Sequence, residues 1–410
     1  MLSVREAIDL FMPKFTPLGS ERLALPDATD RVLAAALPVR NDLPGFDHSA
    51  MDGYALLSAS ARSNPTLQVS AEVRAGDRPQ PLAANTAARI FTGAPLPPGA
   101  DCVVIQEDTT RSGSEVTLRA TPEPGANVRT RASEYRAGAA LFDAGTLLGP
   151  SEIGLLAAQG YAEVEVFRRP RVAILPTGNE LRPLDAPESP FTIVDSNTYA
   201  LSAALTRAGC IAVPLGIAVD DRAIIRSFVD RGLSFDVLIT VGGVSVGDYD
   251  LVSEVLREAA VQVEFHKVAI KPGKPLLFGT HDKGTRATPV IGLPGNPVSA
   301  LVVFEIFVRP GLMRMQGHRD LFPQPIEVKL ANSYNRKPGR TEFVRARLEY
   351  QAGGWLAHIH SQQGSGAMSS LTGGSALVIA PRERGRLEAG ETLKAIVPSL
   401  PRRCDPAFAD

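Results

Sequence analysis

Between residues 171 and 313, short apolar runs alternate with segments of helical periodicity. The apolar runs include RVAIL, DVLITV, PLLFG and PVIGL, and the helical segments include SNTYALSAALTRAG, DRAIIRSFVDRG and DLVSEVLREAA. Short buried strands separated by helices are typical of βαβ units. The pattern therefore predicts an αβ sandwich domain with a mostly parallel sheet over residues 169–318.

Ligands of such sheets bind at the carboxyl ends of the strands, where the loops gather. Four loops follow the predicted strands: TGNE, GGVSVGDYD, KPGK and GLPGNP. We therefore expect the functional site of this domain to be built from these four loops.

The rest of the chain has a different pattern. Residues 39–137 contain short β-favouring runs such as LQVSAEV, AARIF, DCVVIQ and EVTLRA, which predict a β-rich inserted domain. The flanking residues 1–38 and 138–168 are expected to pack together as one discontinuous linking domain. TEFVRARLEY, with VKL, ALVIA and LKAIV, predicts a small C-terminal β-barrel domain over residues 319–402. The predicted fold class is multidomain α/β.

Composition narrows the class of protein. The 410 residues are 44% hydrophobic and 21% charged, with a formal net charge of −1, so no bulk attraction to nucleic acid or anionic membrane is expected. Three widely spaced cysteines cannot supply a disulfide framework. Residues 1–15 have helical periodicity interrupted by charge, unlike a signal peptide, and the apolar stretch 290–308 contains two prolines, which argues against a membrane span. We therefore expect a cytoplasmic enzyme.

The segment DVLITVGGVSVGDYDLVSEVL predicts a buried strand, a glycine-rich loop and a helix. Gly242, Gly243 and Gly247 would let backbone N–H groups approach an anion near the start of that helix. The loop lacks the Lys-Ser/Thr pair of a nucleotide triphosphatase loop. Phosphate binding is one interpretation, and a tight turn with ordinary helix caps is the alternative.

The segment HKVAIKPGKP places Lys267, Lys271 and Lys274 within eight positions around a Pro-Gly turn. Crowded cations repel one another, and a bound oxyanion or phosphate would relieve that repulsion. A helix predicted to begin near Pro297, with Ser299 in its first turn, could hold an anion beside the lysines. The alternative is a solvated basic loop next to ordinary turn residues.

Three acidic residues, Glu180, Asp220 and Asp250, each follow a predicted strand, so their side chains could converge at one edge of the sheet. Carboxylates near phosphate loops often hold Mg²⁺, which prefers oxygen ligands. Each acid alone could equally be a helix cap or a surface residue. The six histidines show no zinc-site spacing, so no transition-metal site is expected.

Together these strings resemble the molybdopterin molybdenumtransferase family, which includes the E domain of gephyrin. The resemblance covers nearly the whole chain and rests on an ordered set of motifs: PGFDHSAMDGYA, FTGAPLPPGAD, TGNEL, DSN, GGVSVGDYD, AIKPGKP, GLPGNPVSA and GRTEFVRA. It implies a homodimer of four-domain subunits. It also implies Mg²⁺-dependent insertion of molybdate into adenylyl-molybdopterin with release of AMP, and transient contacts with the adenylyltransferase and with apo-molybdoenzymes.

The resemblance also implies roles for individual residues. Those matching the family's molybdate or molybdopterin positions are Lys271, Lys274, Ser299, Arg340 and Ser365, with Gly242, Gly243 and Ser245 in the glycine-rich loop. Those matching its catalytic positions are Asp220, Asp250, Glu180 and Lys267, of which the three acids are the expected Mg²⁺ ligands. Those matching the part of the cleft contributed by the partner subunit are Asp52, Thr92 and Glu134.

Three segments depart from the family pattern. Ala132, Ser133 and Glu134 stand where Gly-Glu-Asp is usual, and Asn179 replaces the third residue of Thr-Gly-Asp-Glu. A late Ala-Asn-Gly is replaced by residues 374–376. Two other functions stay open: the adenylyltransferase step of the same pathway, which would use ATP and molybdopterin, and, because of these altered acidic positions, a non-catalytic binding or scaffold role.

Overall fold

The computed structural model describes residues 1–243, 251–284, 286–351, 353–373 and 375–398. The chain forms two compact units. The first comprises Met1–Ala34, Gly145–Gly149 and the chain from Val164 onward, and the second comprises Ala35–Ala144 and Pro150–Glu163. Ser245 and Asp250, both expected in the site, lie outside the described residues.

The centre of the first unit is a six-stranded sheet. Its strand order is β16 (Ile211–Pro214), β13 (Arg171–Pro176), β17 (Val237–Val241), β21 (Ala287–Leu293), β20 (Pro275–Asp282) and β18 (Val261–Lys267). The first four strands pair in parallel, whereas β20 is antiparallel to both of its neighbours. Every strand except β20 therefore runs in one direction, which confirms the predicted mostly parallel sheet.

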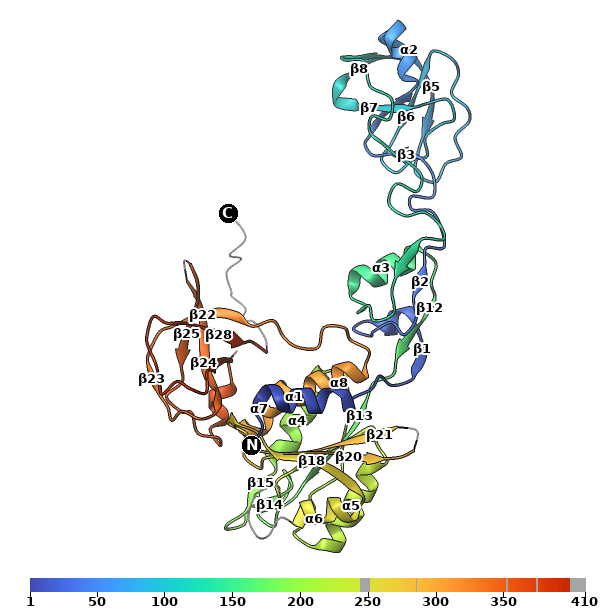
Figure 1. The fold of residues 1–410 in the computed structure, drawn as a ribbon. Coiled ribbons are helices and arrows are strands. Elements are labelled where there is room, and N and C mark those ends of the chain that lie inside the picture. Colours follow the sequence, from blue (N-terminus) through green and yellow to red (C-terminus); the bar gives the residue numbers. More distant parts are fainter. Residues whose placement is uncertain (244–250, 285, 352, 374, 399–410) are drawn as a thin grey trace. The chain divides into compact units, whose positions relative to one another are not determined.

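Helices cover both faces of this sheet (Figure 1). One face packs against α1 (Val4–Phe11), α4 (Ser196–Arg207), α7 (Pro297–Val303) and α8 (Arg309–Met315), and the other against α5 (Arg222–Leu233) and α6 (Leu251–Glu258). Two of these helices begin at an aspartate whose side chain accepts a hydrogen bond from the first turn, Asp195 in α4 and Asp221 in α5. The predicted αβ sandwich is thus present.

The C-terminal part of the first unit is a closed five-stranded barrel. Its strands are β24 (Thr341–Gln351), β25 (Gly354–Ile359), β22 (Ile326–Leu330), β28 (Thr392–Ile396) and β26 (Ser375–Ala380), and β26 pairs back with β24. A short strand, β19 (Ile270–Lys271), adds to β24 in parallel. The predicted barrel is confirmed, and β19 joins it to the lysine-bearing loop of the αβ domain.

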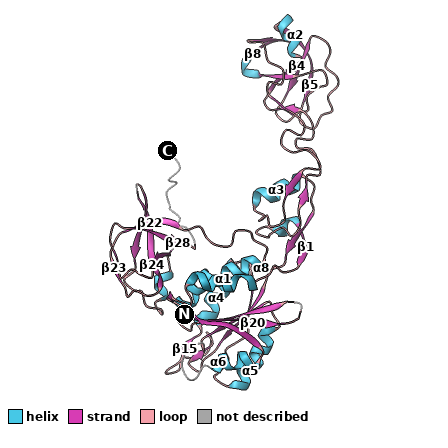
Figure 2. Cartoon of the chain, viewed as in Figure 1, coloured by secondary structure: helices cyan, strands magenta, loops and turns pink. Residues whose placement is uncertain are grey.

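The second unit is mostly strands and loops (Figure 2). Its six-stranded sheet has the order β7 (Cys102–Ile105), β4 (Gly53–Leu56), β6 (Thr86–Ile90), β5 (Thr66–Val73), β9 (Glu115–Leu118) and β8 (Thr109–Ser112). Two helices, α2 (Ser58–Ser63) and α3 (Pro150–Ala158), belong to this unit. No helix in the described part of the chain is long and apolar enough to cross a membrane.

The remaining strands form short two-stranded pairs. These are β1 (Ser20–Ala24) with β12 (Glu163–Phe167), β2 (Leu37–Pro38) with β11 (Ala140–Phe142), β3 (His48–Ser49) with β10 (Val128–Arg129), β14 (Leu181–Arg182) with β15 (Ile193–Val194), and β23 (Tyr334–Asn335) with β27 (Arg386–Leu387).

Candidate functional site

The ends of β13, β17 and β21 meet at Thr177 and the first two glycines of the glycine-rich loop. The Thr177 N–H donates to the Val241 carbonyl at 2.9 Å, and the Gly242 N–H donates to the Leu293 carbonyl at 3.1 Å. Gly242 has a φ of 87°, and a Cβ added there would lie 2.7 Å from the Thr177 carbonyl oxygen. Glycine is therefore required where this loop crosses the sheet edge.

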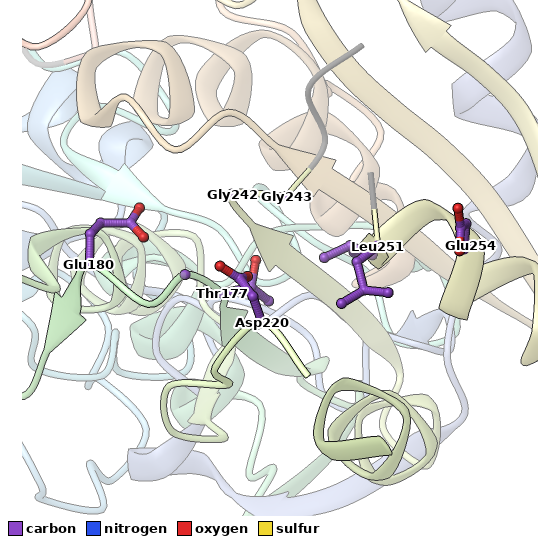
Figure 3. Close-up of a pocket in the computed structure, with 9 residues that line it drawn as sticks. Thr177, Glu180, Asp220, Gly242, Gly243, Leu251 and Glu254 are labelled. Carbon is purple, nitrogen blue, oxygen red and sulfur yellow. The ribbon is translucent and has the colours of Figure 1, made fainter. Parts of the chain in front are cut away.

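A cavity of about 440 Å³ opens over this junction (Figure 3). It is lined by Thr177, Gly178, Glu180, Asp220, Gly242, Gly243, Leu251, Val252 and Glu254. The Thr177 side chain is buried, and within the described part of the chain its hydroxyl has no hydrogen-bond partner. Because an unpaired buried hydroxyl is costly, this group is suited to bind a polar ligand in the cavity.

Asp220 and Asn179 hold the two loops beside this cavity together. The Asn179 N–H donates to Asp220 Oδ2 at 3.3 Å, and the Asp220 N–H donates to Asn179 Oδ1 at 3.0 Å. A parallel bridge between Thr177 and Ala218 continues the contact. The reciprocal pair fixes the Asp220 carboxylate at the cavity wall.

Glu180 also faces this cavity, and Figure 3 shows Glu180 and Glu254 on opposite sides of Asp220. The Glu180 carboxylate lies over Gly178, since a Cβ added to Gly178 would be 2.2 Å from Glu180 Oε2. Among the described residues no three His, Cys, Asp or Glu side chains form a metal-binding group. Two of the three expected Mg²⁺ ligands thus line one cavity.

A second cavity, of about 650 Å³, adjoins the first. The two share four lining residues: Thr177, Glu180, Gly242 and Gly243. The second cavity is also lined by residues 193–197, Pro275, residues 294–297 and Gly366. All four loops expected from the sequence therefore contribute to, or directly flank, one continuous cleft.

The lysine cluster is partly neutralised. Lys271 Nζ lies 2.8 Å from Glu342 Oε1, and the Lys271 side chain is 36% exposed whereas that of Glu342 is fully buried. Lys267 and Lys274 form no ion pair within the described residues. Glu342 thus reduces the repulsion among the three lysines that the sequence alone indicated, while Lys267 and Lys274 keep charges that no described acidic residue pairs with.

Glu342 is held by two further donors. Arg336 Nε donates to its Oε2 at 2.8 Å, and the Tyr334 hydroxyl donates to its Oε1 at 2.9 Å. Burial by itself would raise the pKa of Glu342, but the hydrogen bonds from Lys271, Arg336 and Tyr334 outweigh it and lower that pKa. Burial beside this carboxylate raises the pKa of Tyr334 to about 12. Glu342 is therefore a buried anion, and neither it nor Arg336 was singled out from the sequence.

The start of α7 brings the other expected oxyanion residues together. Ser299 lies in the first turn of α7 and is buried, and the neighbouring Val298 N–H donates to the Ser365 carbonyl at 3.1 Å. A Cβ added to Gly273 would lie 2.4 Å from Val303, so the KPGK turn packs directly on this helix. Arg340 immediately precedes the strand that pairs with β19. The fold thus gathers residues from four segments at one end of the cleft.

In the second unit, Asp52 and Thr92 form a pair. Both the Thr92 N–H and the Thr92 hydroxyl donate to Asp52 Oδ1 at 2.8 Å. These two hydrogen bonds, the backbone one foremost, lower the pKa of Asp52. Glu134 is exposed, and its backbone N–H donates to the Leu43 carbonyl at 3.0 Å. The structure therefore joins two of the three residues expected to act across subunits.

Comparison with known proteins decides the family. Residues 2–160 match the MoeA N-terminal region (domain I and II), residues 173–314 match a probable molybdopterin binding domain, and residues 327–397 match the MoeA C-terminal region (domain IV). A molybdopterin molybdenumtransferase from Nostoc is 36% identical over 93% of this chain and 90% of its own length. One from Haemophilus influenzae is 34% identical over 92% and 93%. The chain belongs to the molybdopterin molybdenumtransferase family.

Solved structures agree with this assignment. Two crystal structures of the molybdopterin biosynthesis MoeA protein from Pyrococcus horikoshii match with TM-scores of 0.81 and 0.82. They are 30% and 27% identical to this chain, cover 97% and 96% of it, and are themselves covered to 99%. The protein is thus a transferase of molybdenum cofactor biosynthesis, with the multidomain α/β fold and C-terminal barrel predicted from the sequence.

The departures from the family pattern have local structural consequences in this chain. Ala132 has a φ of 58°, a left-handed conformation that favours the glycine usual at this position. Asn179 keeps the hydrogen bond to the Asp220 backbone that an aspartate would also accept, but without the charge. Ser375 donates to the Ser370 carbonyl at 2.8 Å inside the barrel, and its neighbour Gly374 lies outside the described residues.

Proposed function

We propose that the enzyme inserts molybdate into adenylyl-molybdopterin, with Mg²⁺-dependent release of AMP. The observation that carries this proposal is the pair of adjoining cavities that meet at Thr177, Gly242 and Gly243. A substrate made of two large groups joined by a pyrophosphate requires two compartments with a phosphate-binding junction between them. Asp220 stands at one compartment, and the basic residues flank the other.

Molybdate is the oxyanion substrate that best fits the basic end of the cleft. A tetrahedral dianion needs several positive or hydroxyl donors arranged around it. The donors that we assign to it are Lys271, Lys274, Ser299, Arg340 and Ser365. The second cavity reaches the segments that carry the two lysines and the two serines, through Pro275, Pro297 and Gly366.

The acidic side of the cleft fits hydrolysis of the pyrophosphate bond. Asp220 and Glu180, with Asp250, would hold Mg²⁺, which when bound offsets phosphate charge. Water adds to one phosphorus, the bridging oxygen leaves with AMP, and one proton is released. The Asp220 carboxylate, aimed by Asn179, supports this chemistry because one of its oxygens, Oδ2, accepts the Asn179 N–H and the other faces no donor within the described residues. Lys267 is assigned to the same reaction.

The remaining assignments complete the proposal. The chain would act as a homodimer of four-domain subunits, with domains at 1–38 plus 138–168, 39–137, 169–318 and 319–402. Asp52, Thr92 and Glu134 would complete the cleft of the partner subunit. In the cytoplasm the enzyme would receive its substrate from the adenylyltransferase and pass its product to apo-molybdoenzymes.

The test is AMP release by the purified full-length protein, given adenylyl-molybdopterin and Mg²⁺ with and without molybdate. We expect molybdate to stimulate AMP release by the unmodified protein. At the molybdate concentrations that stimulate the unmodified protein, the Lys271→Ala variant should show no stimulation. Consumption of ATP with free molybdopterin would instead assign the adenylyltransferase step. A folded protein that releases no AMP under any of these conditions would contradict an enzymatic role for this cleft.

A further inference from the structure

Arg336, which lies between β23 and β24, has a fully buried side chain with four hydrogen bonds. Its Nε donates to Glu342 Oε2 at 2.8 Å, its Nη2 donates to the Arg340 carbonyl, and its Nη1 donates to the Pro381 carbonyl at 2.7 Å and to the Arg384 carbonyl. A buried guanidinium is costly unless its donors are satisfied. The four bonds therefore fix this side chain in one orientation.

Through Glu342, Arg336 controls the position of Lys271. The Glu342 carboxylate bonds Arg336 with one oxygen and Lys271 with the other, at 2.8 Å in each case. The pairing of β19 with β24 also places the backbone of Lys271 opposite that of Glu342. An ammonium group has three N–H donors; Glu342 takes one of them, and no other side chain among the described residues forms an ion pair with Lys271, which leaves two donors for a ligand.

Through its bond to the carbonyl of Arg340, Arg336 also holds the backbone two residues before Glu342. The next residue, Thr341, donates its N–H to the Ala269 carbonyl at 3.0 Å, which joins this segment to the strand carrying Lys271. One buried side chain thus holds the supports of two residues that come from different domains of the first unit.

We propose that Arg336 is a positioning residue that sets the spacing of Lys271 and Arg340 and thereby shapes the oxyanion pocket. This inference rests on the proposed function, because it takes these two residues as molybdate ligands. Arg336 also neutralises Glu342, so the buried carboxylate holds Lys271 without repelling an incoming dianion. The anion itself does not touch Arg336.

The test is molybdate binding to the full-length Arg336→Lys variant, measured by titration calorimetry with sodium molybdate. Lysine keeps the charge but cannot make the forked set of bonds. We expect at least about tenfold weaker molybdate binding, the scale of loss seen when supporting partners of ligand residues are removed. In the AMP-release assay, the KM for molybdate should rise, whereas kcat at saturating molybdate should stay within about twofold.

Two further variants separate positioning from general stability. Leu348→Ala opens a hole in the barrel core on the same strand, away from the network, so it should lower the unfolding temperature and leave molybdate affinity unchanged. If Arg336→Lys does not fold, Glu342→Asp is used instead, because it shortens the link to Lys271 while keeping the charge. Weaker molybdate binding by Glu342→Asp would support the inference.

The outcomes distinguish this inference from the proposed function. Molybdate affinity within about twofold of the unmodified protein in Arg336→Lys, or in Glu342→Asp where that variant replaces it, would overturn the positioning role. An equal loss of affinity in Leu348→Ala would also overturn it. Normal molybdate binding by Lys271→Ala would instead remove the proposed oxyanion site itself.

Discussion

The Asn179 side-chain oxygen accepts a hydrogen bond from the Asp220 backbone N–H at 3.0 Å, and the Asn179 backbone N–H donates to the Asp220 carboxylate at 3.3 Å. Each residue therefore fixes the loop of the other. Among the residues that the structure describes, only the oxygen of the Asn179 amide forms a hydrogen bond, so its NH₂ group can be exchanged for a charged oxygen. The position can be altered in charge without loss of the bond that aims Asp220.

Replacing Asn179 by aspartate tests the role of this charge. Asn179→Asp keeps the acceptor for the Asp220 N–H and adds a second carboxylate beside the first. Since the affinity of an oxygen site for a divalent cation rises with ligand charge, we expect Asn179→Asp to bind the cation about three- to tenfold more tightly than the unmodified protein. Mn²⁺, used as a spectroscopic substitute for Mg²⁺, would be titrated by electron paramagnetic resonance.

Asn179→Ala is the matched control, because it removes the acceptor as well as the amide. We expect it to weaken Mn²⁺ binding by releasing the Asp220 loop. Equal Mn²⁺ affinity in both variants and in the unmodified protein would show that Asp220 does not bind a divalent cation.

The Thr177 hydroxyl gives a second prediction. Thr177→Val removes a buried hydroxyl that has no partner in the described residues and keeps the shape of the side chain. The unfolding temperature should therefore be unchanged or slightly higher. If the hydroxyl donates to the substrate phosphates, the KM for adenylyl-molybdopterin should rise about tenfold, the effect of losing one hydrogen bond to a charged group. An unchanged KM would place the phosphates elsewhere in the cleft.

The sequence predicted this part of the site because its signals are local. Each loop of the cleft follows a strand whose apolar run is visible in the sequence, and parallel strands bring their carboxyl ends to one edge. The glycine-rich loop needs glycine at Gly242 because the Thr177 backbone lies 2.7 Å from where a Cβ would be. The requirement for glycine is therefore visible in the sequence itself.

The network around Glu342, in contrast, could not be recognised in the sequence. In a half-exposed strand polar residues usually face water, so Glu342 and Arg345 in TEFVRARLEY look like exposed positions. Both are buried, because β24 is covered by the barrel core and by the 362–370 loop. Burial of a charge depends on partners distant in sequence, such as Lys271. One barrel strand, β25, was not predicted; it begins within a Gly-Gly turn, and its uninterrupted apolar run is only three residues long.

The left-handed backbone of Ala132 gives a third prediction. An alanine in this conformation is strained by about 1–2 kcal/mol. Glycine would relieve this strain in the folded protein, but it also raises the conformational entropy of the unfolded chain, which offsets part of the gain in stability. Ala132→Gly should therefore stabilise the protein by about 0.5–1 kcal/mol. The free energy of unfolding would be measured with urea. Ala139→Gly, in the same loop but at an alanine without positive φ, should instead lower the free energy of unfolding. A destabilised Ala132→Gly would contradict the strain argument.

Asp236 gives a prediction on pH. This carboxylate accepts hydrogen bonds from Arg168 at 2.8 Å, from the Arg171 N–H at 2.8 Å and from Arg286 at 3.1 Å. Burial alone would raise its pKa, but these partners outweigh burial and hold the pKa below 3.8, its ordinary value. A lowered pKa in the folded protein means that the contribution to stability is complete above the unfolded pKa and is lost as pH falls through the folded one.

Asp236→Asn should therefore destabilise the protein at pH 7, by about 1–3 kcal/mol for a partly buried charged network. The difference from the unmodified protein should shrink as pH falls below about 4, where Asp236 of the unfolded chain becomes protonated, and should be lost once pH falls through the lower pKa of the folded state. Urea unfolding at several pH values would measure this difference. Glu349→Gln alters a partly exposed pair between Glu349 on β24 and His358 on β25; it is the control and should have little effect at pH 7. A constant difference across the whole pH range would show that the charge of Asp236 does not carry its stabilising effect.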